Sequence, residues 1–210
     1  MTPYYEDADA GITIFHARCE DVLPSIDPAD VGLLLTDPPY GINLDTDYAG
    51  RKMRGGKTYA QVAHDARDFD PSVLLTYRRC VLWGGNNFSD ALPPGGWMVW
   101  RKTNPHPFAS ECELAWTNLT RTIRSYASTI RPDGFGLHPT QKPVGLMRWI
   151  VDRWTEPGDL VLDPYMGSGP IARACADLGR RYIGIELVED YCATAVARLA
   201  QQTLNLGDAS

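Results

Sequence analysis

The tetrapeptide Asp37-Pro38-Pro39-Tyr40 follows an apolar segment and combines a carboxylate, two prolines and an aromatic ring. The prolines lack amide donors and fix φ, which leaves a stiff turn with outward carbonyl groups. Asp37 and the Pro38 carbonyl can together accept both N–H groups of an exocyclic amine, while Tyr40 can stack on an extruded base. Such a site would favour attack of the amine on a methyl sulfonium through positioning and electrostatics. The alternative is a rigid turn that only terminates a strand.

A second candidate motif at residues 160–170 consists of an apolar run, a Gly-x-Gly turn and a proline that suits a helix start. Gly167 and Gly169 would let a ligand approach backbone N–H groups closely, and Ser168 lies between them. The motif is neither a phosphate-binding Gly-Lys-Ser/Thr loop nor a full dinucleotide fingerprint, because Ala172 replaces the third glycine. A purely structural turn is the alternative.

Acidic and aromatic residues around this turn indicate what it could bind. Asp163 ends the apolar run, where its charge would favour the cationic side of a ligand, and Tyr165 could add a cation–π contact. Glu186 ends the next apolar run, and an acid at that place can bind both ribose hydroxyls of a nucleoside cofactor.

Strand-like and helix-like runs alternate along the chain, which predicts an α/β fold with a mostly parallel sheet covered by helices. Ligands of such sheets bind beyond the carboxyl ends of the strands, where both motifs would lie. The predicted strands cover residues 12–15, 31–36, 80–83, 97–100, 113–116, 159–163 and 182–185. The predicted helices cover residues 71–79, 142–154, 170–178 and 189–202.

Two segments outside this alternation carry basic residues. Residues 43–64 contain three glycines and are expected to form a mobile loop, and residues 118–136 have no clear period and are expected to be an irregular insertion. Basic side chains in these segments could contact DNA phosphates, although a solvated surface explains them as well. The candidates are Arg51, Lys52, Arg54, Lys57, Arg121 and Arg124.

Length and composition are typical of a single domain of 210 residues with 44% hydrophobic and 22% charged residues. The net charge of −6 argues mildly against nucleic acid, but the local basic clusters partly offset it. The five cysteines lack zinc-ligand spacing, so no metal is expected. No apolar run spans a bilayer and the N-terminus lacks signal-peptide features, so a cytoplasmic protein without membrane contact is expected.

The chain resembles the amino-group DNA methyltransferases of the permuted beta class, the N6-adenine/N4-cytosine type. In that class the Asp-Pro-Pro-Tyr motif precedes the cofactor loop, as residues 37–40 precede residues 163–169 here. Between them, the hexapeptide at residues 138–143 looks like the family element that comes just before the cofactor loop. By this resemblance His138, Thr140 and Lys142 would help to hold the cofactor.

The resemblance implies a Rossmann-like fold with a seven-stranded, mainly parallel sheet, one antiparallel strand, helices on both faces and a circularly permuted motif order. It implies a single catalytic domain over residues 1–210, with residues 118–136 as a short target-recognition segment. The expected cofactor is S-adenosyl-L-methionine, and the expected substrate is the N6 amine of adenine in flipped-out DNA. Besides DNA, a second copy in a homodimer and a separate restriction endonuclease are candidate partners that the sequence leaves open, in a bacterial or phage context.

Three positions depart from the family pattern. Arg18 lies where the family often has the acid that faces the adenine amine of the cofactor, so no cofactor role is assigned to it. Tyr165 replaces the usual phenylalanine, and Pro170 replaces the usual threonine. An aromatic ring is kept and proline suits a helix start, so both changes are compatible with the fold.

Three other functions compete with adenine methylation. N4-cytosine methylation uses the same geometry, but in this family serine is the commoner companion of cytosine at the position of Asp37. Methylation of protein glutamine usually goes with asparagine at that position and with the cofactor loop first in the chain. The third alternative is a non-catalytic DNA-binding relic of the fold, against which the intact Asp-Pro-Pro-Tyr motif argues.

Overall fold

The structure is a computed structural model that describes residues 1–40, 69–105, 110–130 and 141–200. Its strands are β1 (Tyr5–Asp7), β2 (Ile12–His16), β3 (Leu33–Thr36), β4 (Cys80–Trp83), β5 (Gly96–Lys102), β6 (Cys112–Thr117), β7 (Ile123–Ser128), β8 (Leu160–Asp163) and β9 (Arg181–Glu186). Its α-helices are α1 (Cys19–Val22), α2 (Val144–Trp154), α3 (Pro170–Leu178) and α4 (Glu189–Ala200). The segment 43–64, predicted to be a mobile loop, lies outside the described residues.

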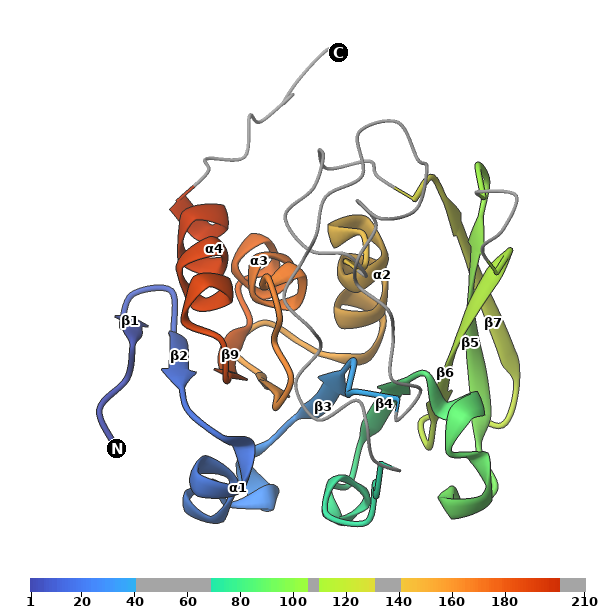
Figure 1. Ribbon diagram of the computed structural model, residues 1–210, viewed down its shortest axis with the longest axis horizontal. Helices are drawn as coiled ribbons and strands as arrows, with labels where there is room; N and C mark the ends of the chain where they lie inside the picture. Colours follow the sequence, from blue (N-terminus) through green and yellow to red (C-terminus); the bar gives the residue numbers. More distant parts are fainter. Residues whose placement is uncertain (41–68, 106–109, 131–140, 201–210) are drawn as a thin grey trace, which may run out of the picture.

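All these strands form one sheet in the order β1-β2-β9-β8-β3-β4-β6-β5-β7 (Figure 1). The five neighbours β2, β9, β8, β3 and β4 run parallel to one another. β6 runs antiparallel to both β4 and β5. The seven strands β2, β9, β8, β3, β4, β6 and β5 thus form the expected mainly parallel sheet with one antiparallel strand. The described sheet has nine strands rather than seven because β1 and β7 extend its two edges.

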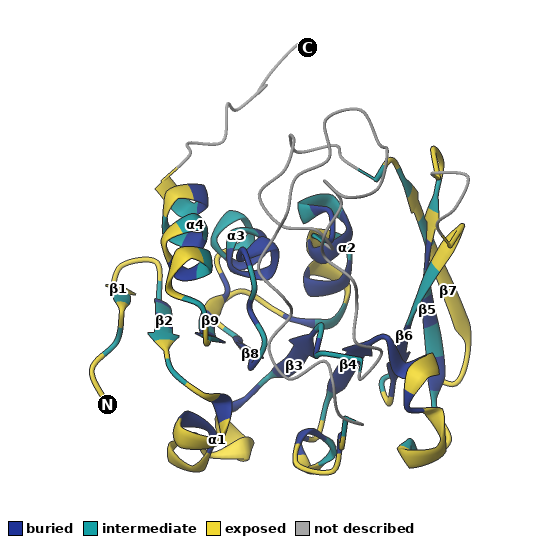
Figure 2. Cartoon of the chain, in the orientation of Figure 1, coloured by how far each residue is buried: buried dark blue, intermediate teal, exposed yellow. Residues whose placement is uncertain are grey.

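The central strands are apolar on both sides, as a parallel sheet between two layers requires. Every residue of β3, β4 and β8 is buried, whereas exposed residues gather at the edges and helix surfaces (Figure 2). Leu33 and Leu35 face the layer of α2, α3 and α4, while Leu34 faces α1 and the short 3-10 turns. The helices expected on both faces are therefore long on one face and short on the other.

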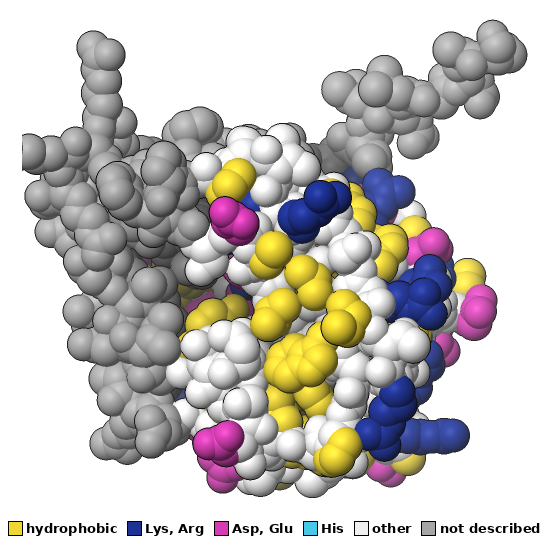
Figure 3. Space-filling view, turned by 90° about the vertical axis from the view of Figure 1, so that its right-hand side faces the viewer, with side chains coloured by type: hydrophobic (Ala, Val, Ile, Leu, Met, Phe, Trp, Pro, Cys, Tyr) yellow, Lys and Arg dark blue, Asp and Glu magenta, His cyan; other side chains and the backbone are white. Residues whose placement is uncertain are grey.

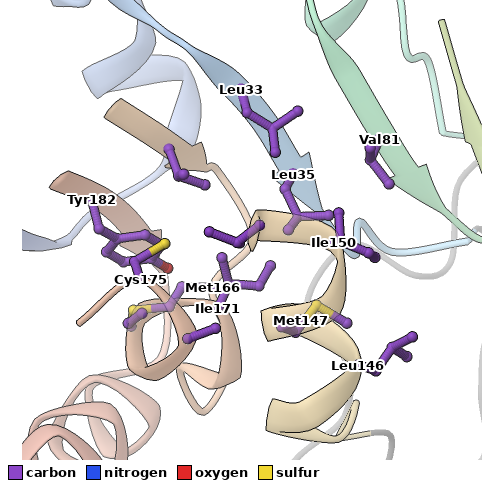
Figure 4. Packing of buried hydrophobic residues seen from close by; sticks show 14 of the residues in the cluster. Leu33, Leu35, Val81, Leu146, Met147, Ile150, Met166, Ile171, Cys175 and Tyr182 are labelled. Atoms are coloured by element: carbon purple, nitrogen blue, oxygen red, sulfur yellow. The ribbon is translucent and has the colours of Figure 1, made fainter. Parts of the chain in front are cut away.

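The longer helices meet the sheet through one buried cluster. Met147 and Ile150 of α2 pack with Leu35 and Val81 of the sheet, and Ile171 of α3 belongs to the same cluster (Figure 4). Helix α2 has its buried residues on the face that the sequence periodicity indicated. This packing fixes the segment just before α2 against the carboxyl ends of β3 and β4.

Each strand predicted from the sequence is present, and three of the four predicted helices are confirmed with small shifts at their ends. The predicted helix at residues 71–79 is wrong, since only a 3-10 turn, Leu74–Thr76, forms there. The backbone turns extended at Tyr77 because the chain must reach Cys80, which pairs with Leu34 in the sheet. The local apolar pattern does not reveal this demand.

The insertion expected at residues 118–136 is not irregular throughout, because it contains β7. This strand pairs in parallel with β5 from Trp97 to Lys102, and most of its side chains are exposed. An edge strand with one unpaired side needs little apolar sequence, which explains why its residues gave no strand signal. Residues 131–136 lie outside the described part of the chain.

No helix within the described residues is both long enough and apolar enough to cross a membrane.

Replacing Ile150 by alanine should lower the free energy of unfolding by roughly 2–5 kcal/mol, because it opens a cavity in the α2–sheet cluster. Ile123, which is 71% exposed on β7, provides the matched control. Ile123→Ala should cost less than about 1 kcal/mol. Urea unfolding of both variants checks this expectation, and equal losses would contradict the packing described for α2.

Candidate active site

The two sequence motifs lie at the carboxyl ends of neighbouring parallel strands. β3 ends at Thr36, so Asp37 follows it directly, and β8 pairs with β3 and ends at Asp163. The carboxyl ends of parallel strands share one edge of a sheet, so the motifs meet although they are far apart in sequence. Both motifs therefore lie at the sheet edge at which the sequence predicted them.

Asp163 joins the two motifs through hydrogen bonds. Its Oδ1 accepts a bond from the Thr36 hydroxyl at 2.7 Å and one from the Tyr165 amide at 3.3 Å. Its Oδ2 accepts a bond from the Tyr182 hydroxyl at 3.1 Å. The side chain is fully buried, and this burial raises its pKa to about 7 although the three bonds lower it. These contacts make Asp163 an internal link between the two motifs. That it also faces the charged end of a ligand stays a prediction.

The glycine turn has the backbone that a close ligand approach requires. Gly167 and Gly169 both have positive φ, at 55° and 74°, and Gly169 is the N-cap of α3. A Cβ atom on Gly169 would lie 2.6 Å from the Cβ of Ala195. Only glycine therefore fits there, and the turn is fixed against α4.

Glu186 closes this turn from the end of β9. Its Oε2 accepts a bond from the Gly167 amide and its Oε1 one from the Val188 amide, both at 2.8 Å. Burial raises the pKa of Glu186, whereas these backbone bonds act in the opposite direction. Each carboxylate oxygen can accept a second bond, so the side chain retains capacity for a pair of ribose hydroxyls. The residues around the turn thus fit a nucleoside cofactor.

Ser168 and Tyr165 have internal partners. The Ser168 hydroxyl lies 3.4 Å from Gln141 Oε1, and its carbonyl accepts a bond from Arg198 Nε at 2.9 Å. The Tyr165 hydroxyl accepts a bond from the Cys19 thiol at 3.4 Å, and burial raises the pKa of Tyr165. These contacts place the start of α1 beside the cofactor loop.

The departure at Arg18 is at the surface. Its guanidinium lies 3.6 Å from the Glu20 carboxylate, and both side chains are more than half exposed. Because its side chain is exposed to solvent, a basic residue is tolerated at this position.

Each carboxylate oxygen of Asp37 has a partner, Tyr40 from the same motif and Lys142 from the segment before α2. The Tyr40 hydroxyl donates to Oδ1, and Lys142 Nζ donates to Oδ2 at 2.5 Å. Lys142 also lies 3.2 Å from the Tyr40 hydroxyl. The ring of Tyr40 lies against Gly84, where a Cβ atom would come within 1.9 Å of Tyr40 Cε1. Gly84, at the end of β4, is therefore part of the site.

Lys142 contacts Asp37 and Tyr40 of the catalytic motif. The role in holding the cofactor that the resemblance implies stays a prediction. The Lys142 side chain is only 3% exposed. Burial by itself would lower the pKa of Lys142, but the Asp37 and Glu113 carboxylates raise it well above the usual range. The ammonium is thus a permanent cation next to Asp37.

The sequence did not predict two residues of the site, Glu113 and Lys102. Glu113 on β6 accepts from Lys142 Nζ at 3.0 Å and from Lys102 Nζ, on β5, at 2.7 Å. Burial would raise the pKa of Glu113, but the two ammonium groups bring it below its ordinary value. The available signal was an acid inside a strand between apolar neighbours, since such acids are rare in sheet interiors without a partner.

Arg121 and Arg124 are not brought to the site. Arg121 precedes β7 and Arg124 is near its start, and β7 runs in the same direction as β3, β4 and β5. Both residues therefore lie toward the amino ends of the strands, away from Asp37. Figure 3 faces the side of the molecule on which β7 forms the edge of the sheet. Contact of these two arginines with DNA, and target recognition by residues 118–136, stay predictions.

Other expected site residues lie outside the described part of the chain. They are His138, Thr140, Arg51, Lys52, Arg54 and Lys57. Among the described residues, no group of three or more His, Cys, Asp or Glu side chains could hold a metal ion. All five cysteines are free thiols.

A Rossmann-like sheet with a glycine turn after β8 and an Asp-Pro-Pro-Tyr motif after β3 is the arrangement of methyltransferases that use S-adenosylmethionine. A family model described as DNA methylase matches residues 92–197. The protein named Putative methylase YubD, of Escherichia coli (strain K12), is 30% identical over 91% of this chain and 92% of its own length. The chain belongs to this family, the N6/N4 amino-group DNA methylases in the permuted arrangement.

Further relatives agree with this assignment. Type II methyltransferase M2.DpnII of Streptococcus pneumoniae is 28% identical over 76% of this chain, which spans 56% of that relative. The crystal structure of the M1.HpyAVI–SAM complex has a TM-score of 0.58 with 26% identity, and it covers 90% of this chain and 100% of its own. PvuII DNA methyltransferase, cytosine-N4-specific, has a TM-score of 0.67 with 14% identity over 92% of this chain and 88% of its own.

The raised pKa of Asp163 predicts a pH dependence of stability. Between about pH 4 and pH 7 the folded protein keeps a proton that the unfolded chain has released, so the free energy of unfolding falls as pH rises. The stabilising contribution is complete below about pH 4 and lost above about pH 7. Asp163→Asn removes this titration, so wild type should lose more stability than the variant across that window.

Urea unfolding of the ligand-free proteins at several pH values measures this difference. Other carboxyl groups titrate in both proteins and cancel in the comparison. Parallel stability profiles for wild type and Asp163→Asn would contradict the buried, proton-binding state of Asp163.

Proposed function

We propose that this protein transfers a methyl group from S-adenosyl-L-methionine to N6 of adenine in a base turned out of DNA. The carrying observation is the position of the Asp37 carboxylate, held by Lys142 at the strand edge that also bears the glycine turn. Asp rather than Ser at position 37 favours adenine over cytosine. N4-cytosine methylation is the second candidate, since PvuII DNA methyltransferase has the same fold.

Binding of the cofactor falls to the turn after β8 and to Glu186. The open backbone at Gly167 and the spare acceptor capacity of Glu186 suit the nucleoside part. When bound, S-adenosylmethionine supplies the methyl group as an electrophilic sulfonium. Asp163, through Thr36, keeps this half of the site in register with Asp37.

The catalytic half positions the target amine. Asp37 and the Pro38 carbonyl accept its two N–H groups, which frees the nitrogen lone pair for attack. Positive charge develops on the nitrogen as the methyl group is transferred, and the Asp37 carboxylate stabilises that charge. The nitrogen then loses a proton, so no strong general base is needed.

Tyr40 changes partner as the base enters. Its hydroxyl now occupies Asp37 Oδ1, the oxygen that the amine would use. Rotation of Tyr40 away from Gly84 would release that oxygen and present the ring for stacking on the base. Entry of the base and exposure of the acceptor would thus occur together.

Asp37→Asn should lower kcat by about 100-fold or more, because the amide cannot stabilise developing positive charge as a carboxylate does. Purified protein is incubated with labelled S-adenosylmethionine and unmethylated DNA, and the nucleosides are identified by mass spectrometry. Asp90→Asn, an acid-to-amide change at an exposed residue, is the control and should keep full activity.

N6-methyladenine that disappears in Asp37→Asn supports the proposal. If N4-methylcytosine is found instead, the proposed mechanism holds but the substrate base is cytosine. If wild type binds the cofactor yet produces no methylated nucleoside, the DNA methylation proposal is wrong.

Tyr40→Phe and Tyr40→Ala separate the two roles of Tyr40. Tyr40→Phe keeps the ring and frees Asp37 Oδ1, so kcat/KM for DNA should stay within about threefold of wild type. Tyr40→Ala loses stacking worth about 1–3 kcal/mol per base, so kcat/KM should fall by about tenfold or more. Steady-state kinetics on a duplex substrate measures both, and equal losses in the two variants would contradict a stacking role.

A further inference from the structure

An alternating chain of charges extends from the catalytic carboxylate into the sheet. Asp37 contacts Lys142, Lys142 contacts Glu113, and Glu113 contacts Lys102, with distances of 2.5, 3.0 and 2.7 Å. The groups come from four places in the chain: the end of β3, the segment before α2, β6 and β5. The sheet therefore brings them together, and no local motif does.

Lys142 is fully occupied by this arrangement. Its ammonium has three N–H donors and lies near three acceptors: Asp37 Oδ2, Glu113 Oε2 and the Tyr40 hydroxyl. The same ammonium lies 5.4 Å from the centroid of the Trp83 ring. Its position and direction are consequently fixed before any substrate binds.

A cation this close to Asp37 has an electrostatic cost for the reaction. Positive charge develops on the target nitrogen beside Asp37, and an unshared Lys142 ammonium would oppose it in a buried site. Glu113 shares Lys142 and so leaves more of the Asp37 charge available to the amine. Lys102 in turn balances Glu113, so the four side chains are together neutral.

Stability alone is a weak reason to keep such a network. Buried ion pairs contribute little compared with well-packed apolar residues, because desolvation offsets most of their attraction. On the same strand, the nearby residues Ala115 and Trp116 are buried. The network lies next to the catalytic carboxylate, which points to a role in the reaction.

We propose that Glu113 is a positioning residue for methyl transfer: it holds Lys142 in place and shares its charge, so that Asp37 can accept and stabilise the target amine. This role rests on the proposed function. Glu113 does not contact the glycine turn or Glu186, so it should affect the chemical step rather than cofactor binding.

The test compares Glu113→Gln with Glu113→Asp in steady-state kinetics with S-adenosylmethionine and DNA. Glu113→Gln keeps the shape but removes the charge, and kcat should fall about tenfold or more while KM for S-adenosylmethionine changes by less than about threefold. Glu113→Asp keeps the charge at shorter reach, and its kcat should lie between those of wild type and Glu113→Gln. A purely structural role predicts the reverse order, since glutamine fills the space better.

Glu111→Gln is the matched control, because it makes the same change at an exposed acid just before β6. It should match wild type in kcat and KM. If wild type is active and Glu113→Gln is equally active, the role proposed for Glu113 is wrong, whereas the proposed function stands. Wild type without any methylated nucleoside would instead overturn the proposed function.

If Glu113→Gln does not fold, nuclear magnetic resonance of the Lys142 ammonium in wild type tests the charge network on which the role of Glu113 depends. We expect a slowly exchanging ammonium signal that stays protonated to higher pH than the signals of surface lysines. An ammonium that exchanges and titrates like theirs would overturn the network.

Discussion

The contact between the Lys142 ammonium and the Asp37 carboxylate is the constraint on which the catalytic half of the site depends. It joins the end of β3 to the segment before α2, and α2 is itself held by apolar packing against the sheet. Because the ammonium is buried, the contact is only weakly screened by solvent and salt. The direction in which Asp37 points is therefore set by the core of the protein.

A second buried link holds the cofactor half against the catalytic half. Asp163 ends β8 and accepts a bond from Thr36, the last residue of β3, so neighbouring strands are joined at their carboxyl ends. The two halves come from distant parts of the chain, in the permuted order that the sequence showed. A parallel sheet makes this order unimportant, since adjacent strand ends meet whatever their sequence separation.

Local patterns were sufficient to predict the inner strands, the longer helices of one face and the two main motifs, because buried strands and amphipathic helices have their own periodicity. The edge strand β7 was missed because exposure on its outer side removes that periodicity. The helix expected at residues 71–79 failed because the pairing of Cys80 with Leu34 fixes where the chain must become extended.

The chemistry was less predictable than the fold. Glu113 and Lys102 join the site only through the register of β5 with β6 and of β6 with β4, which no single segment encodes. Lys142 was identified by its motif, but its contact with Asp37 was not predicted, since a motif gives residue types and not the direction of a side chain. Asp37 and Glu186 could be identified from their places at strand ends, where ligands of such sheets bind.

The most direct test of the central claim is a crystal structure of the protein with an S-adenosylmethionine analogue and a DNA duplex. We predict that the Tyr40 hydroxyl has left Asp37, that the amine of the flipped adenine lies within hydrogen-bond distance of Asp37 and of the Pro38 carbonyl, and that Lys142 still contacts Asp37. A flipped base whose amine lies away from Asp37, with the Tyr40–Asp37 contact intact, would contradict the role of this carboxylate.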